Sequence, residues 1–158
     1  MEGQSEFISK KKKKIKIEMS VKKMLREEES FGIKNFKTYQ KFGEKVYEIR
    51  KNVLKNIKKL KENKKFIVGY GAPAKATTAL NFFGISSEID FIVEDNKLKH
   101  NKLIPGVKIP IKNKSNIKNK KNALLVLAWN FYKDIKKNNA NLSDYFVNIK
   151  DLESNKWK

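Results

Sequence analysis

The chain has 158 residues with no cysteine and one histidine, His100, which fits one domain and excludes disulfide, thiolate-zinc and Cys-nucleophile chemistry. Lys and Arg number 37 against 17 Asp and Glu, a net charge of +20 that raises nucleic acid or an anionic membrane as partners. However, only Arg26 and Arg50 are arginine, and lysine accompanies Asn and Ile along the chain, which indicates a coding bias rather than one basic patch.

Two helices are expected before the first strand, after a basic arm at residues 1–19. The run Lys10–Lys14 has no apolar periodicity, so we expect a loosely held arm. Ser20 is a candidate N-cap for a short helix that ends near Gly32. A longer helix follows, with apolar residues at steps of three and four: Phe42, Val46, Ile49, Val53, Ile57 and Leu60. We expect this stripe to pack on a sheet of the same chain, with another subunit or domain as the alternative.

From Phe66 onward, short apolar runs alternate with helical segments. The run at 66–68 leads into a turn and a helix over 74–83, with Pro73 in its first turn and Gly84 at its end. Further segments are a strand at 89–93, an irregular extended edge segment at 103–111, a loop or surface helix at 113–122, a buried strand at 123–128, a helix at 131–137 and a strand at 145–149. The alternation predicts an α/β fold over 20–158: a Rossmann-like, mostly parallel sheet with helices on both faces, preceded by two N-terminal helices.

The pattern Gly69-x-Gly71-x-x-Ala74 meets the Gly/Ala variant of the dinucleotide fingerprint, between a strand and a helix. Small residues let the backbone approach a phosphate, free N–H groups at the helix start attract its charge, and Lys75 adds a cation. Glu94 or Asp95, at the end of the second strand, is placed to contact a ribose. The residues alone leave a structural interpretation equally open, in which the glycines only form the turn, Ala74 only packs the helix and Asp95 only caps a turn.

Two further positions invite a functional interpretation. His100 follows Lys99 on a polar loop, and we expect it to be a solvated surface residue rather than a catalytic base. Trp129-Asn130 follows the strand at 123–128, at the edge where open α/β sheets bind ligands, so a site role and a packing role stay open for Trp129.

Several segments, in order along the chain, resemble one family: Gly69–Lys75, Leu80–Ile85, Val93–Asp95, Lys99, Leu103–Gly106, Ile109–Ile111 and Leu127–Asn130. They are similar to the C-terminal domain of the sugar C-methyltransferases, which use S-adenosylmethionine to methylate a carbon of a nucleotide-linked keto-deoxy sugar. The resemblance covers most of residues 21–149. The family's zinc-binding segment needs cysteines, and its central methyltransferase domain needs a second glycine-rich turn upstream of Gly69; neither is found here.

The resemblance implies a substrate site at one edge of the sheet. The turn after the first strand faces the nucleotide sugar, the loop after the second strand adjoins it, and Trp129-Asn130 closes the edge. Ala76, where the family usually has glycine, and Glu94, which extends the acidic strand end, are departures that leave the detailed choice of substrate open. The expected site residues are Gly69, Tyr70, Gly71, Ala72, Ala74, Lys75, Asp95, Lys99, Trp129 and Asn130.

The resemblance also implies partners and cofactors. The partners are a nucleotide-linked keto-deoxy sugar and a methyltransferase catalytic domain that is separately encoded or missing here, and S-adenosylmethionine serves the complete enzyme. We expect the chain alone to be catalytically incomplete and to bind no cofactor or metal. No apolar run approaches the roughly 20 residues of a membrane span, and the N-terminus lacks a signal-peptide core, so we expect a cytoplasmic protein without a membrane partner.

Two alternative functions remain open. The first is an NAD(P)-binding oxidoreductase or sensor that uses the fingerprint and Glu94, although no hydride-transfer partner is evident. The second is a nucleic-acid binder led by the lysines at 10–14 and 118–121. Because arginine is scarce and no nucleic-acid-binding motif is found, we do not expect nucleic acid as a partner.

Overall fold

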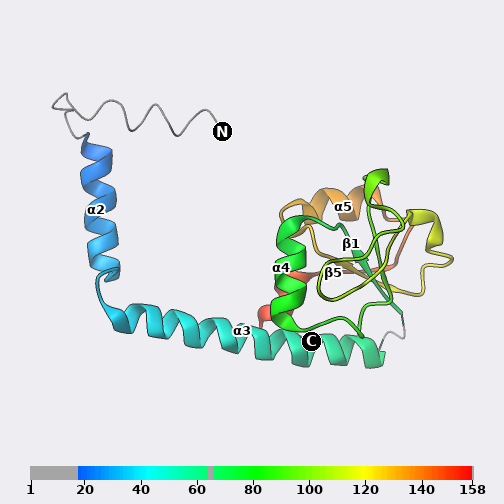
Figure 1. Cartoon of the computed structure of the whole chain (residues 1–158), viewed down its shortest axis with the longest axis horizontal. Coiled ribbons are helices and arrows are strands. Elements are labelled where there is room, and N and C mark those ends of the chain that lie inside the picture. Colours follow the sequence, from blue (N-terminus) through cyan, green and yellow to red (C-terminus); the bar gives the residue numbers. More distant parts are fainter. Residues whose placement is uncertain (1–17, 64–65, 158) are drawn as a thin grey trace. The chain divides into compact units, whose positions relative to one another are not determined.

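The computed structural model describes residues 18–63 and 66–157 (Figure 1). The described residues belong to two compact units, which divide between Glu44 and Lys45. The expected basic arm, including its run Lys10–Lys14, lies outside the described residues except for its last two positions.

The first unit contains helix α2 (Met19–Phe31) and the start of helix α3 (Phe36–Asn63). As predicted, α2 ends at Gly32, whose left-handed backbone (φ 80°) closes the last turn. The expected N-cap at Ser20 is wrong, because the helix begins after Glu18 and the Ser20 hydroxyl donates to the Glu18 carboxylate at 3.4 Å from within the first turn. No residue of α2 is buried.

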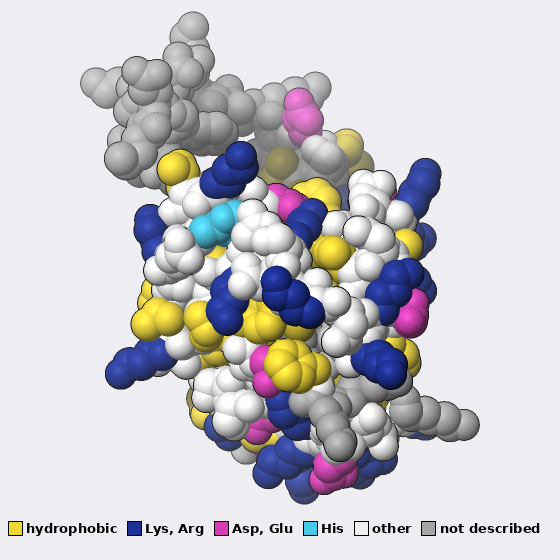
Figure 2. Space-filling view, turned by 90° about the vertical axis from the view of Figure 1, so that its right-hand side faces the viewer, with side chains coloured by type: hydrophobic (Ala, Val, Ile, Leu, Met, Phe, Trp, Pro, Cys, Tyr) yellow, Lys and Arg dark blue, Asp and Glu magenta, His cyan; other side chains and the backbone are white. Residues whose placement is uncertain are grey.

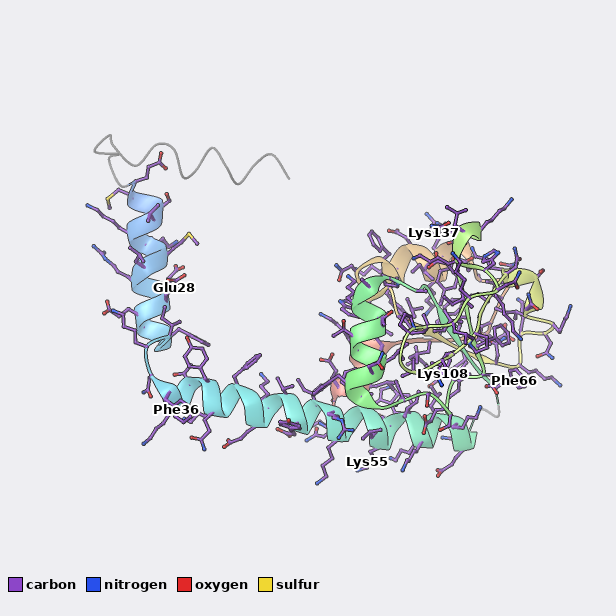
Figure 3. All side chains as sticks on the ribbon, viewed as in Figure 1. Glu28, Phe36, Lys55, Phe66, Lys108 and Lys137 are labelled. Carbon is purple, nitrogen blue, oxygen red and sulfur yellow. The ribbon has the colours of Figure 1, made fainter. Side chains whose placement is uncertain are left out.

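Helix α3 carries the predicted apolar stripe, and the structure buries its second half. Val53, Ile57 and Leu60 are at most 1% exposed, whereas Phe42 is 67% exposed. Lys55 lies on the opposite, solvent-facing side of the helix (Figure 3). Packing of the stripe on this chain's own core is therefore confirmed for its C-terminal half.

The second unit is built on five parallel strands in the order β3-β2-β1-β4-β5. The central strand has four buried residues, as expected for a strand covered on both faces. The predicted α/β fold with its Rossmann-like parallel sheet is thus confirmed. The strands are β1 (Ile67–Tyr70), β2 (Phe91–Val93), β3 (Ile111–Lys112), β4 (Ala123–Val126) and β5 (Tyr145–Asn148).

Short helical segments connect these strands. Helix α4 (Ala74–Phe83) has the predicted bounds, with Gly84 (φ 71°) at its end and Pro73 as its N-cap, one position before the expected first turn. The remaining elements are α5 (Tyr132–Asn138) and the 3-10 helices η1 (Lys97–Lys99), η2 (Lys114–Asn116), η3 (Trp129–Phe131) and η4 (Ile149–Glu153).

Alternate residues of the strands build a core on each face of the sheet. Ile67 and Leu125 belong to the core that includes residues of α3 and α4. Val68 and Val126 belong to the other, against which Ile135 of α5 packs. Helices α4 and α5 accordingly border different sides of the sheet (Figure 1).

One face of the molecule agrees with the interpretation of the lysines as a compositional bias. On the face shown in Figure 2, Lys and Arg side chains are scattered among hydrophobic and neutral ones instead of gathering in one patch. No helix within the described ranges is long and apolar enough to cross a membrane.

Candidate functional site at the carboxyl edge of the sheet

A cleft of about 360 Å³ opens at the carboxyl ends of β1, β2 and β4. The chain moves from β1 outward in one direction to β2 and β3 and then in the other to β4 and β5, so the cleft lies at the switch point where open parallel sheets bind ligands. Its wall consists of Tyr70, Gly71, Pro73, Glu94, Asp95, Lys99, Ala128, Phe131 and Ile135.

The structure brings only some of the predicted site residues together in this cleft. Tyr70, Gly71, Asp95 and Lys99 line it. The other predicted residues have different positions: Gly69 and Ala72 are buried, Ala74 and Asn130 are exposed, and Lys75 contacts Trp129.

The glycine turn uses its backbone donors internally. The Gly71 N–H donates to the Val93 carbonyl at 2.8 Å, and the Ala72 N–H donates to Glu94 Oε2 at 2.8 Å. Pro73 has no N–H to offer. These three consecutive residues therefore present no free backbone donor to a phosphate.

Both glycines of the turn have a structural reason. A Cβ on Gly69 would lie 2.7 Å from Ile92 Cγ1, so this position allows the close packing of two strands. Gly71 has a φ of +87°, and a Cβ there would lie 3.0 Å from Ala128 Cβ. The spacing of the fingerprint thus follows from the packing of β1, β2 and the segment after β4.

The Glu94 carboxylate lies beside this turn, where it accepts the Ala72 N–H as a bound anion would. Besides the Ala72 contact, its Oε1 accepts from the Asn96 N–H at 3.1 Å, and Lys99 Nζ lies 3.4 Å from its Oε2. Burial acts to raise the pKa of Glu94, but the two backbone donors and the Lys99 ammonium outweigh it and lower the pKa below its ordinary value. The side chain, only 14% exposed, is therefore a carboxylate at neutral pH.

A second network connects β1 with the segments that follow β2, β3 and α5. The Tyr70 hydroxyl donates to Asp95 Oδ2 at 2.7 Å, and Lys114 Nζ lies 2.6 Å from Asp95 Oδ1 and 2.8 Å from Asn139 Oδ1. Burial, opposed in part by Lys114, raises the pKa of Tyr70. Burial acts to raise the pKa of Asp95 as well, yet Lys114 and Tyr70 outweigh it and lower the pKa. Asp95 is thus a structural ion-pair partner as well as part of the cleft wall.

Trp129 and His100 both have structural contacts. The Trp129 ring packs partly against the core, with Lys75 Nζ at 4.5 Å and Lys150 Nζ at 5.9 Å from its centroid. His100 is half-buried, with Nε2 2.7 Å from the Glu94 carbonyl oxygen, so it is not the solvated surface residue expected from the sequence. No group of three His, Asp or Glu side chains within the described ranges could hold a metal ion.

Three residues at this edge were missed by the sequence reasoning: Lys114, Asn139 and Lys150. Lys114 lies just beyond β3 and Lys150 just beyond β5. The signal that could have found them is their place directly after parallel strands, because all carboxyl ends of a parallel sheet meet at one edge. Asn139, at the end of α5, carries no comparable signal.

Comparison with known proteins identifies the family. Residues 4–147 match the family described as the C-methyltransferase C-terminal domain. The chain is also similar to C-methyltransferase NovU of Streptomyces niveus, with 31% identity over 118 residues that make up 73% of this chain and 28% of NovU. The chain thus spans less than a third of the length of this relative. Because the family match extends over most of the sequence, the protein belongs to the C-methyltransferase C-terminal domain family.

Proposed function

We propose that this chain is the substrate-binding domain of a sugar C-methyltransferase that uses S-adenosylmethionine, and that the cleft holds part of a nucleotide-linked keto-deoxy sugar. The observation that carries the proposal is the position of the cleft, at the switch point of a parallel sheet in a member of this family. Its volume of about 360 Å³ falls within the range of small-molecule sites.

The ionisable groups of the cleft favour binding over proton transfer. A general base that deprotonates the carbon next to a sugar ketone works best with a pKa near the working pH. The pKa of Glu94 and the pKa of Asp95 are lowered, and the pKa of Tyr70 is raised. All three pKa values are therefore shifted further from neutral pH. These groups therefore serve as fixed hydrogen-bonding partners for sugar hydroxyls.

The methyl donor and the base belong, in this proposal, to a methyltransferase catalytic domain on the same or on another polypeptide. The aligned region is 28% of NovU, which leaves most of that enzyme outside the match. The NAD(P)-binding alternative gains no support from residues 71–73, because Gly71 and Ala72 use their N–H groups internally and Pro73 has none for a dinucleotide phosphate.

The test is a thermal-shift and calorimetric comparison of dTDP, a dTDP-linked keto-deoxy sugar, NAD and S-adenosylmethionine. A ligand that binds only the folded state raises the melting temperature. We expect the dTDP compounds to bind and NAD not to bind. A response to NAD alone would contradict the proposal.

A matched pair of exposed aromatic residues locates the binding. Phe131 lines the cleft and is 62% exposed, and Phe66 is 50% exposed and precedes β1, at the opposite edge of the sheet (Figure 3). We expect Phe131→Ala to weaken binding of the dTDP-linked sugar and Phe66→Ala to leave it unchanged. Equal effects of the two substitutions would place the ligand elsewhere.

A further inference from the structure

Several lysine side chains lie at the carboxyl edge of the sheet, and two of them pair with carboxylates. Lys99 Nζ lies 3.4 Å from Glu94, and Lys114 Nζ lies 2.6 Å from Asp95. Lys75 and Lys150 form no ion pair with any carboxylate in the part of the chain that the structure describes. Lys75 and Lys150 therefore contribute unpaired positive charge to this edge.

These two lysines come from distant parts of the chain and meet at one aromatic ring. Lys75 lies in the first turn of α4, Lys150 lies in η4 after β5, and both ammonium groups lie within 6 Å of the Trp129 ring centroid, at 4.5 and 5.9 Å. Trp129 is itself fixed by packing against the core. Two positive charges beside one ring attract an anion, and an anion of charge −2 or more can pair with both.

In the glycine turn, residues 71–73 offer a phosphate no free backbone donor. Glu94 accepts the Ala72 N–H, the Gly71 N–H is used by β2, and Pro73 has no N–H. A phosphate in the turn would have to displace a carboxylate that also contacts Asn96 and Lys99. The negative charge of Glu94 repels a phosphate at the Ala72 N–H, so Glu94 blocks this part of the turn.

We propose that Lys75 and Lys150, beside Trp129, bind the phosphate groups of an anionic ligand, and that Glu94 keeps phosphate out of the glycine turn. The identity of that ligand as the diphosphate of a nucleotide sugar rests on the proposed function. The position of the anion site, beside Trp129, does not depend on the proposed function. The cleft then receives the uncharged part of the ligand, and the lysine pair receives its charge.

The test is isothermal titration of the full chain with inorganic pyrophosphate and with dTDP, at low and at high salt. The variants are Lys75→Gln, Lys150→Gln and Glu94→Ala, and the control is Lys118→Gln, an exposed lysine that lines a separate pocket with Phe66. Melting curves of each variant show that it is folded. Each of the two site substitutions should weaken both probes about three- to tenfold, as expected for one partly exposed ion pair to phosphate.

The control variant and Glu94→Ala have defined expected results, and other outcomes would refute the anion site or the proposed function. Lys118→Gln should bind both probes as the wild type does, and Glu94→Ala should bind pyrophosphate at least as tightly, because the Ala72 N–H and Lys99 become free. If Lys75→Gln and Lys150→Gln bind both probes unchanged, or if the wild type binds neither, the anion site is refuted. If pyrophosphate requires the lysine pair but dTDP binds no better than pyrophosphate, the anion site stands and the nucleotide-sugar proposal fails.

Discussion

Removal of the Glu94 carboxylate tests the closed glycine turn directly. In Glu94→Ala, the N–H groups of Ala72 and Asn96 lose their acceptor, and Lys99 loses its ion pair. A hydrogen bond to a charged group contributes about 1.5–3 kcal/mol, and water replaces part of that loss at a side chain that is 14% exposed. We therefore expect the free energy of unfolding to fall by about 2 kcal/mol, which lowers the melting temperature by about 4–8 °C in a domain of this size.

The loss should depend on pH in a defined direction. The pKa of Glu94 is lowered in the folded chain from its ordinary value of 4.5, because its hydrogen bonds and Lys99 outweigh the effect of burial. A group whose folded pKa is depressed stabilises the fold above its unfolded pKa, and this stabilisation is lost as the pH falls through the folded pKa. The difference between wild type and Glu94→Ala should thus be constant between about pH 6 and 8 and shrink below about pH 4.5.

The assay is urea unfolding followed by circular dichroism at pH 7, 5 and 3.5, with two comparison variants. Glu62→Ala, at an exposed position near the end of α3, should change the free energy of unfolding by less than about 0.5 kcal/mol. Glu94→Gln keeps a neutral acceptor, so it should lose less stability than Glu94→Ala and show little of the pH dependence. Equal stability of Glu94→Ala and wild type at pH 7 would refute the assignment of Glu94 to the turn.

The remaining predictions concern the fold that supports the site. Gly69→Ala places a Cβ 2.7 Å from a neighbouring isoleucine side chain and should cost about 1–3 kcal/mol in urea unfolding. Gly43→Ala, which meets nothing within 4 Å inside α3, should instead stabilise the helix by up to about 1 kcal/mol, and destabilisation there would contradict this. Ile57→Ala, in the buried half of the α3 stripe, should cost about 2–5 kcal/mol, whereas Phe42→Ala should cost less than about 0.5 kcal/mol; equal losses would show that the two halves are buried alike.

Elements with strong local signals were predicted well from the sequence. Helix α4 has the bounds that Pro73 and Gly84 indicated, because a proline before a helix and a glycine after it act through their own backbone geometry. The strand predicted at 123–128 was visible as a continuous apolar run, since a strand buried on both faces needs apolar residues at every position, and in the structure it ends at Val126. Ser20 was misassigned because propensity favours Ser as an N-cap, whereas the helix begins two residues earlier, after Glu18, whose side chain forms no cap hydrogen bond.

The segment around the glycine turn shows most clearly which features the sequence determined and which the tertiary structure decided. By itself, the sequence determined the α/β alternation, the place of the turn between a strand and a helix, and the resemblance to the family, because all of these depend on residues close together in the chain. It left Glu94 open between a ribose contact and a departure from the family pattern. The tertiary structure decided that Glu94 closes the turn, through a bond across 22 residues.

The tertiary structure also explains why Lys114 and Lys150 were not predicted as site residues. Tyr70 meets Asp95 across 25 residues, and the two lysines join the site only because β3 and β5 end at the same edge as β1. Hydrophobic periodicity specifies which face of an element is buried, and it contains no record of which loops meet. Which polar side chains face each other follows from strand order and register, so the pairing of Lys99 with Glu94 and of Lys114 with Asp95 was decided by the tertiary structure.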